Sequence, residues 1–450
     1  MRRLQLLYLV YGGVVAVVGP FIGPMLQARG LDPAGIGIVG ALMGIAFALS
    51  VPAWGHVADV VLGRPRALQV AALLSVAAVA VFGAPLPVGV AVLALIAYNL
   101  TQSSFMPLSD AIAMTAYQGT TARTYGRLRL FASLMFAVSI VAAGILYDHA
   151  GYAPAYGLYA IVTLAMAAIL VGVPDAPRAV LSSLLPDHGA TPPGGRIPEP
   201  HGHPGPGRSR WQQALGSSGV ALATQPRLWG VLAAIVAANV AVVASWTFLP
   251  LRLVDLGATP SMVALATGMG ALCEVPAMLV AHRVSPRVGL RGLFGLGCLL
   301  YAAGFVAWIS LDEPLLIVAF RGVAGFGFAW ITMACVLTMP VILPAPLQAT
   351  GQALYQTGAY GLAATVANLG GGLVVSLLGY RALFALGALA ATGAIVLGWR
   401  TLPIRGERPR EARAGVIDDA APVPVPAVGQ PADPLDASLP ATTTGARAGR

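Results

Sequence analysis

Residues 52–66 read PAWGHVADVVLGRPR and residues 276–291 read PAMLVAHRVSPRVGLR, and each stretch begins with a proline near the end of an apolar segment. The two prolines lie 224 positions apart. The same offset takes Arg3, ahead of the first apolar segment, to Arg227. The chain is therefore built from two similar halves, each with a charged turn after its second apolar segment.

The composition indicates a membrane protein. Of the 450 residues, 57% are hydrophobic and only 10% are charged, with a mean hydropathy of +0.79. Soluble domains carry about 25% charged residues. Apolar runs of roughly 18 to 25 residues recur along the chain, which is long enough for helices to cross about 30 Å of hydrocarbon. Two similar halves in a membrane favour a transporter, in which the site lies between the repeats.

The apolar runs divide into two sets of six. They lie near 4–26, 34–58, 67–84, 88–108, 129–147, 153–172, 228–250, 261–282, 292–310, 314–341, 351–377 and 381–399. The sequence thus predicts an all-α integral membrane protein of twelve transmembrane helices in two six-helix halves, 1–173 and 226–401. A Pro-, Gly- and His-rich linker, 174–225, and an Ala- and Pro-rich tail, 402–450, are predicted to be disordered and cytoplasmic.

The arginines predict the orientation. The N-terminus and three short loops on one side hold ten of them, at positions 2, 3, 64, 66, 123, 127, 129, 283, 287 and 291. The other side holds Arg29, Arg252 and Arg381. Positively charged loops stay in the cytoplasm, so both termini are expected there. These arginines account for the net charge of +9, so no nucleic-acid partner is expected.

The residue types also limit the chemistry. All 26 basic residues are Arg, so the chain has no lysine for a Walker A motif or for a Schiff base. Cys273, Cys298 and Cys335 have no metal-like spacing and are expected to be buried, inert thiols. We therefore expect no cofactor, no metal in the spans and no ATP-driven pump. A metal on the linker histidines is the weaker alternative.

Several motifs resemble the major facilitator superfamily (MFS) across residues 1–172 and 225–401. Gly55-x-x-Ala58-Asp59, followed by Gly63-Arg64, resembles the signature between helices 2 and 3, although Val60 replaces a usual basic residue. A narrower similarity is to the phenylpropionate permease and nucleoside–proton symporter branch. It rests on the stretches 107–110 (PLSD), 125–130 (YGRLRL), 274–276 (EVP) and 352–355 (QALY).

The resemblance implies a gating role for the first charged turn. Asp59 would face the start of helix 11, near Thr350, where free N–H groups favour a carboxylate. Either Arg127 or Arg129 would pair with Asp110 or Asp59, since residues two apart on a helix point in different directions. The predicted gating set is Gly55, Asp59, Arg64, Asp110, Arg127 and Arg129. The alternative is that these charges only set topology.

Glu274 is the predicted proton carrier. About thirteen residues into helix 8, it would lie roughly 20 Å deep, where an isolated charged carboxylate is costly. It should therefore face a cavity, form a pair or hold a proton. Arg321, roughly 10 Å into helix 10, would bind an anionic group or neutralise Glu274. The alternative for both is a purely structural hydrogen bond or ion pair.

Uncharged polar residues could complete a substrate cavity. Aromatic rings beside hydrogen-bonding groups suit a ring-bearing or hydroxylated solute. Helix packing is the alternative explanation for each of them. Together with Arg321, the candidates are Asn99, Gln102, Asn239, Trp246, Thr247, Tyr355, Gln356 and Tyr360.

The sequence predicts a monomeric, multi-pass transporter of the cell membrane that moves a small organic solute by alternating access. Proton-coupled uptake is the first hypothesis, and efflux of drugs or metabolites by the same fold is the second. A non-transporting receptor or an integral-membrane enzyme is the third. An enzyme would need converging nucleophile, base or metal ligands, which the spans lack. No enzymatic activity is therefore expected.

Overall fold

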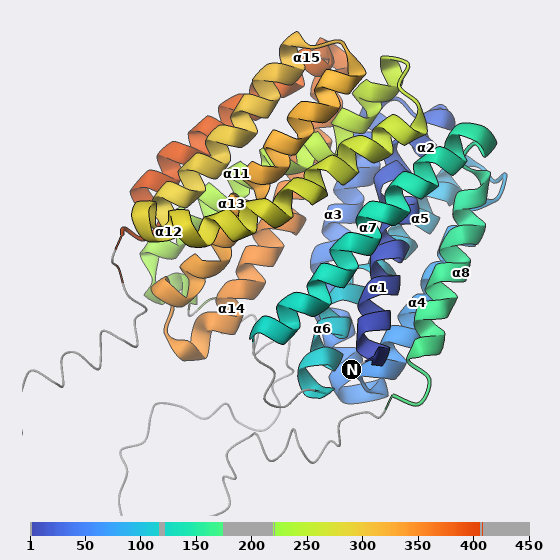
Figure 1. The fold of residues 1–450 in the computed structure, drawn as a ribbon, viewed down its shortest axis with the longest axis horizontal. Helices are drawn as coiled ribbons and strands as arrows, with labels where there is room; N and C mark the ends of the chain where they lie inside the picture. Colours follow the sequence, from blue (N-terminus) through green and yellow to red (C-terminus); the bar gives the residue numbers. More distant parts are fainter. Residues whose placement is uncertain (1, 117–121, 174–218, 220, 406, 408–450) are drawn as a thin grey trace, which may run out of the picture. The chain divides into compact units, whose positions relative to one another are not determined.

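The protein is described by a computed structural model over residues 2–116, 122–173, 219, 221–405 and 407; the side chains of residues 2, 114–130, 345, 346 and 349 are not described. The predicted linker and tail thus lie almost entirely outside the described residues. Every described element is helical. Figure 1 shows the helices before residue 174, coloured blue to green, beside those after residue 219.

The first group of helices covers residues 2–169. Its elements are α1 (Arg2–Val18), η1 (Gly19–Phe21), α2 (Ile22–Ala28), α3 (Pro33–His56), η2 (Val57–Leu62), α4 (Arg64–Gly83), α5 (Val88–Gln102), α6 (Phe105–Ala116), α7 (Ala122–Ala150) and α8 (Ala153–Ile169). The second group covers residues 226–401. Its elements are α11 (Pro226–Asp255), α12 (Pro260–Ser310), α13 (Pro314–Ile342), α14 (Ala345–Gln356), η3 (Thr357–Leu362) and α15 (Ala363–Thr401).

Proline marks where several helices begin. Pro33, Pro226, Pro260 and Pro314 each occupy the first position of a helix, where the missing N–H has no helical partner to lose. Asp32 also caps α3 by accepting a hydrogen bond from the Gly35 amide at 3.0 Å. These residues set the sharp entries that follow the short turns.

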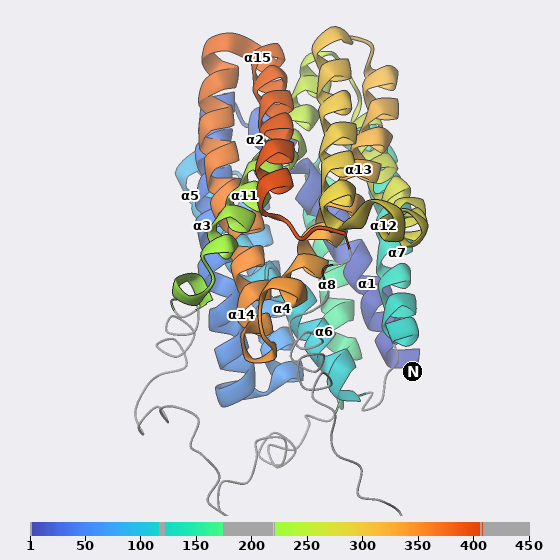
Figure 2. The same ribbon diagram turned by 90° about the vertical axis from the view of Figure 1, so that its left-hand side faces the viewer.

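The two longest helices each contain a break. Gly289 in α12 and Gly379 in α15 have positive φ values of 73° and 81°, a conformation that only glycine adopts readily. Each break reverses the chain, and the two limbs of α15 run side by side in Figure 2. The predicted runs 261–282 and 292–310 are therefore the two limbs of α12, and 381–399 is the second limb of α15.

The two charged turns, at residues 52–66 and 276–291, each contain a glycine with a positive φ. Gly63, with φ of 84°, ends the first turn, and Gly289, with φ of 73°, lies 226 positions later in the second. In each case an arginine follows within two residues, Arg64 and Arg291. Each turn therefore contains one glycine with a positive φ, although a π-helical segment precedes only the first.

The described part of the chain has nine stretches that are long and apolar enough to cross a membrane, together with the shorter apolar helix Ala153–Ile169. Each of the twelve predicted runs falls on helix. Large apolar side chains remain on the outside, for example Leu377, which is 71% exposed. Such a surface suits lipid, because hydrocarbon solvates leucine as well as a protein core does. The all-helical membrane class is confirmed.

Candidate functional site

The charged turn after α3 forms a local cluster on one side of the protein. Asp59 lies in the π-helical segment η2 and accepts a hydrogen bond from Nε of Arg64 at 3.2 Å. Nη1 of Arg64 donates to the carbonyl oxygen of Ala111 at 3.4 Å, which ties the turn to α6. Gly55 lies in the last turn of α3 with open space beside it. Arg64 therefore links the predicted gate residue to the helix that carries Asp110.

Asp110 is anchored to the first helix. The buried hydroxyl of Tyr8 in α1 donates a hydrogen bond to its carboxylate at 2.5 Å. A hydroxyl bonded to a carboxylate is among the stronger hydrogen bonds in proteins. Arg127 and Arg129 lie on α7, but their side chains are outside the described part, so their pairing stays a prediction.

On the opposite side, the two groups of helices contact each other directly. Asp148, in the last turn of α7, accepts a hydrogen bond from the backbone N–H of Ser261 at 2.8 Å, in the first turn of α12. Gln27 donates to Asp255 at 2.6 Å. These contacts lie beside the loops 29–32, 151–152 and 256–259. They join α2 and α7 to α11 and α12 at the end of the helices remote from Asp59.

Glycines allow α3 and α15 to approach closely near the same end. A Cβ built on Gly37 would lie 2.4 Å from the carbonyl oxygen of Asn368 and 2.9 Å from Cα of Gly372. A Cβ on Gly40 would lie 2.6 Å from Cγ of Asn368. Since real contacts are never that short, no side chain fits at these positions while the two helices are packed together.

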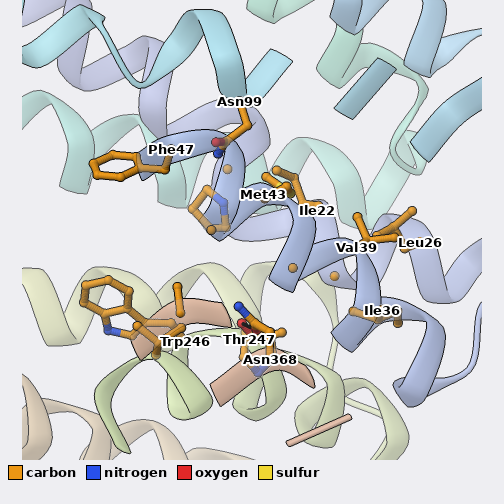
Figure 3. A pocket seen from close by; sticks show the side chains of 18 of the residues that line it. Ile22, Leu26, Ile36, Val39, Met43, Phe47, Asn99, Trp246, Thr247 and Asn368 are labelled. Carbon is orange, nitrogen blue, oxygen red and sulfur yellow. Dashed lines mark hydrogen bonds between the residues drawn. The ribbon is translucent and has the colours of Figure 1, made fainter. Parts of the chain in front are cut away.

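A largely apolar chamber of about 300 Å³, called the neutral chamber below, lies between these helices (Figure 3). Asn99 and Phe47 line it from one side, and Trp246, Thr247 and Asn368 line it from the other. The hydroxyl of Thr247 donates to Oδ1 of Asn368 at 2.6 Å. Oδ1 of Asn99 is buried without a hydrogen-bond partner. The chamber thus offers one unsatisfied amide group among mostly aliphatic and aromatic walls.

A second chamber of about 360 Å³, the charged chamber, contains both ionisable residues that the sequence singles out. Glu274 enters it from α12 and Arg321 from α13. Arg321 is only 7% exposed, and its Nη1 has no hydrogen-bond partner. Among the described residues, Arg321 and Glu274 make no ion pair with each other or with another side chain.

The two chambers share a wall. Gly19, Pro20, Trp246 and Pro250 line both of them. The indole of Trp246 stacks on Tyr360 with ring centroids 6.3 Å apart and packs edge-on against Phe328 at 5.2 Å. The two chambers are therefore neighbours across this indole, and only one of them is lined by charged residues.

The other predicted cavity residues lie elsewhere. Asn239 is buried and donates to the carbonyl oxygen of Ile235, four residues earlier on the same helix, at 2.9 Å. Tyr355 is buried against Tyr360, and Gln356 is exposed. Gln102 is half-buried and lines neither chamber. The predicted residues that the fold brings to the chambers are therefore Asn99, Trp246, Thr247, Tyr360 and Arg321.

Sequence reasoning missed several lining residues. Asn368 is an amide inside an otherwise apolar run, which is the same signal that singled out Asn99. Ser245 and Thr267 line the charged chamber but are small polar residues of a type common at helix contacts. Gly270 was also missed, although a Cβ there would lie 3.2 Å from Cζ of Arg321. Nothing in a single sequence marks that glycine.

Metal ligation has no support in the described part of the chain, where no group of three or more His, Cys, Asp or Glu side chains could hold an ion. Cys298 and Cys335 are buried and Cys273 is half-buried, and all three are free thiols. The linker histidines lie outside the described residues.

Comparison with known proteins identifies the class. Residues 1–386 match the MFS_1 like family. The chain is 27% identical over 376 residues to the maltose permease of Geobacillus stearothermophilus, covering 82% of this chain and 85% of the permease. It is 32% identical over 176 residues to the probable 3-phenylpropionic acid transporter of Escherichia coli (strain K12), covering 38% and 44%. The crystal structure of the nucleoside transporter NupG superposes with a TM-score of 0.69 at 14% identity, covering 89% and 97%.

These similarities define an MFS transporter: a multi-pass membrane protein of the cell membrane that moves small solutes by secondary transport and is not an enzyme. The chain belongs to the MFS_1 like family. The resemblance to the major facilitator superfamily is confirmed, and part of the chain is also similar to the probable 3-phenylpropionic acid transporter.

Proposed function

We propose that the protein takes up a small organic solute together with protons, and that Glu274 carries the coupling proton. The observation that carries the proposal is the position of this carboxyl group. It lies fourteen residues after the start of α12 at Pro260, which is about 21 Å at 1.5 Å per residue. There it lines the charged chamber.

A carboxylate at that depth needs compensation. Ionised carboxylates are expensive near the bilayer centre, and those found there usually pair or exchange protons. Glu274 has no ion pair among the described residues, and a cavity gives it access to solvent or substrate. Both features support reversible protonation over a fixed structural pair.

We also propose twelve crossings with both termini in the cytoplasm. Dividing the broken stretches Pro260–Ser310 and Thr350–Thr401 at their glycines, and adding Ala153–Ile169, supports this number. The halves would be 1–173 and 226–401, with a cytoplasmic linker and tail. The arginine-rich turns after α3 and within α12 support the orientation through the positive-inside rule.

With that orientation, the contacts of Asp148 with Ser261 and of Gln27 with Asp255 lie on the outer side. They support an inward-facing arrangement, closed outside. The predicted gating set, from Gly55 and Asp59 to Asp110 and Arg129, would then act at the inner side. Asp59 would meet the start of α14 only in the opposite, outward-facing state.

The test is solute uptake into proteoliposomes with an imposed pH gradient. Maltose, 3-phenylpropionate and uridine make a first panel, because the relatives' names point to these solute classes. Gradient-driven uptake should be lost in Glu274→Gln, while exchange of solute without a gradient should persist. Glu313→Gln, at an exposed carboxylate in a loop, is the matched control. Coupled uptake that survives Glu274→Gln would reject the carrier assignment.

Efflux by the same fold is the second candidate, because the charged turn fits either direction. Energised everted vesicles separate the two. An exporter accumulates the solute inside such vesicles, whereas an importer does not.

A further inference from the structure

The guanidinium group of Arg321 occupies a site built around it. Its Nη1 is buried and unpartnered, and the side chain is only 7% exposed. The group lies over Gly270, where a Cβ would come within 3.2 Å of both Cζ and Nη1. An arginine is always charged, and a buried charge is costly unless a partner compensates it. Among the described residues Glu274 is the acid near the guanidinium, but the two form no ion pair, so Nη1 is left without an acceptor that an anion would supply.

Glu274 lies one helical turn from Gly270 on the same face of α12. The charged and titratable groups around it are Arg321 from α13, Tyr301 from the second limb of α12, and its own neighbour Cys273. The residues of α1, η1, α7 and α11 that line the chamber carry no titratable group. Arg321 is therefore the single cation among the lining residues, and Glu274 is the single acid.

The neutral chamber begins where the charged one ends. From their shared wall at Trp246 it extends along apolar side chains, among them Ile22, Val39, Met43 and Phe47. It presents few hydrogen-bonding groups, and two of these, Thr247 and Asn368, already bond to each other. A sugar carries a hydroxyl on nearly every carbon, and burying unpaired hydroxyls is costly. The walls favour an apolar or aromatic body.

We propose that the substrate is an organic monocarboxylate whose carboxylate binds Arg321 and whose apolar body lies beside Trp246 in the neutral chamber. This assignment rests on the proposed function and names its substrate class. Arg321 can make two parallel hydrogen bonds to one carboxylate. The nearby neutral chamber, of about 300 Å³, has the size of a small-molecule site.

Glu274 and Arg321 together also explain how binding of the proton and binding of the substrate anion depend on each other. While Glu274 is ionised, its charge compensates Arg321 across the chamber and repels a second carboxylate. Once Glu274 takes up a proton, Arg321 is left uncompensated and accepts the substrate anion. One proton and one monoanion then enter together, so transport is electroneutral. Release of both in the cytoplasm restores the starting state.

The test uses the full-length protein in nanodiscs, with phenylacetate and its neutral amide, phenylacetamide, as probes. Equilibrium binding is measured by calorimetry at pH 6 and pH 8, and proton uptake by an indicator dye. A bidentate, charge-assisted contact predicts that the acid binds about 10- to 100-fold more tightly than the amide. About one proton should be taken up per phenylacetate bound at pH 8.

Three variants assign the roles. Arg321→Gln should remove the preference for the acid over the amide. Glu274→Gln should keep that preference but abolish proton uptake and the dependence on pH. Arg381→Gln, which breaks an exposed ion pair with Asp312, is the control and should bind as wild type does. Arg321→Lys keeps the charge, and thermal unfolding of each variant separates misfolding from lost binding.

Several outcomes overturn the assignment. Equal binding of acid and amide, or a preference that survives Arg321→Gln, removes Arg321 as the carboxylate site. If maltose binds more tightly than phenylacetate and its affinity is unchanged in Arg321→Gln, the substrate is a neutral solute. If phenylalanine binds more tightly than phenylacetate and Glu274→Gln abolishes this binding, Glu274 is a ligand for an ammonium group.

The two proposals fail separately. Carboxylate binding through Arg321 without proton uptake leaves the substrate class standing and removes the coupling role of Glu274. If maltose uptake is proton-coupled and Glu274→Gln abolishes it, the coupling role of Glu274 stands and the monocarboxylate substrate class is removed.

Discussion

Closing of the outer side should require that position 37 carries no side chain, as in Gly37. The methyl group of Gly37→Ala places a carbon 2.4 Å from the Asn368 carbonyl oxygen and 2.9 Å from Cα of Gly372. Both neighbours are backbone atoms of α15, so neither can rotate away. The helices α3 and α15 must separate by about 1 Å before this carbon reaches an ordinary contact distance.

The cost falls on one conformation. Overpacking a close contact costs about 1–3 kcal/mol, and the proposed outward-facing state would escape this cost if α3 and α15 separate there. At about 2 kcal/mol the ratio of outer-closed to outer-open molecules falls about 30-fold. A protein that populates the two states equally would then be outer-closed in about one molecule in thirty.

The assay is the distance between spin labels at positions 28 and 313, on exposed residues at the outer ends of α2 and α13. Cys273, Cys298 and Cys335 are first replaced. Gly37→Ala should shift the distance distribution to the longer component. Gly157→Ala is the matched control, since its new Cβ would meet nothing within 4 Å. An unchanged distribution in a folded Gly37→Ala protein would refute the claim that outer closure requires this glycine contact.

Three further variants follow from the described contacts. Asp148→Asn weakens the charge-assisted bond to the Ser261 amide and should lower the outer-closed population about 2- to 5-fold in the same spin-label assay, for a helix-terminus effect of 0.5–1 kcal/mol; no change would mean that the bond is solvent-compensated. Trp246→Ala removes the wall between the chambers and should raise the KM for uptake about tenfold or more. The temperature of thermal unfolding should stay within a few degrees of the wild-type value. An unaltered KM would place the substrate elsewhere. Gly63→Ala forces a side chain into positive φ and should destabilise the turn by about 1–2 kcal/mol, seen as a lower Tm in detergent, whereas an unchanged Tm would show that the turn relaxes freely.

The fold was predictable because its signals are local. Apolar runs of bilayer length and helix-starting prolines can be read from neighbouring residues, and the repeat of the turn at Gly63 can be read by sliding the chain on itself. The same rules place the two limbs of α12 and of α15 but do not show the conformation of the turn that joins each pair. That depends on the exact φ of Gly289 and Gly379.

The site was predictable only in part, because most of these helices have no polar face to orient them. A buried amide such as Asn239 can satisfy itself on its own helix, as its bond to Ile235 does, or line a chamber as Asn99 does. Sequence does not distinguish the two. Ionisable residues are more informative, since a charge within a span must find a cavity or a partner. Glu274 and Arg321 therefore met in one chamber, while Gln102 and Gln356 did not.

The two charged turns that mark the repeat each contain a positive-φ glycine but differ in charge. In the first, Asp59 and Arg64 pair within the turn, and Arg64 extends the cluster to α6. In the second, Arg283 replaces the acid, and the acidic residue of that region is Glu274, nine positions earlier and inside the membrane. A carboxylate in a turn can respond to the position of a neighbouring helix, whereas one in a chamber can respond to a proton and an anion. Under the proposed function, Asp59 in the first half would respond to closure, and Glu274 in the second half would respond to the coupling proton and the substrate anion.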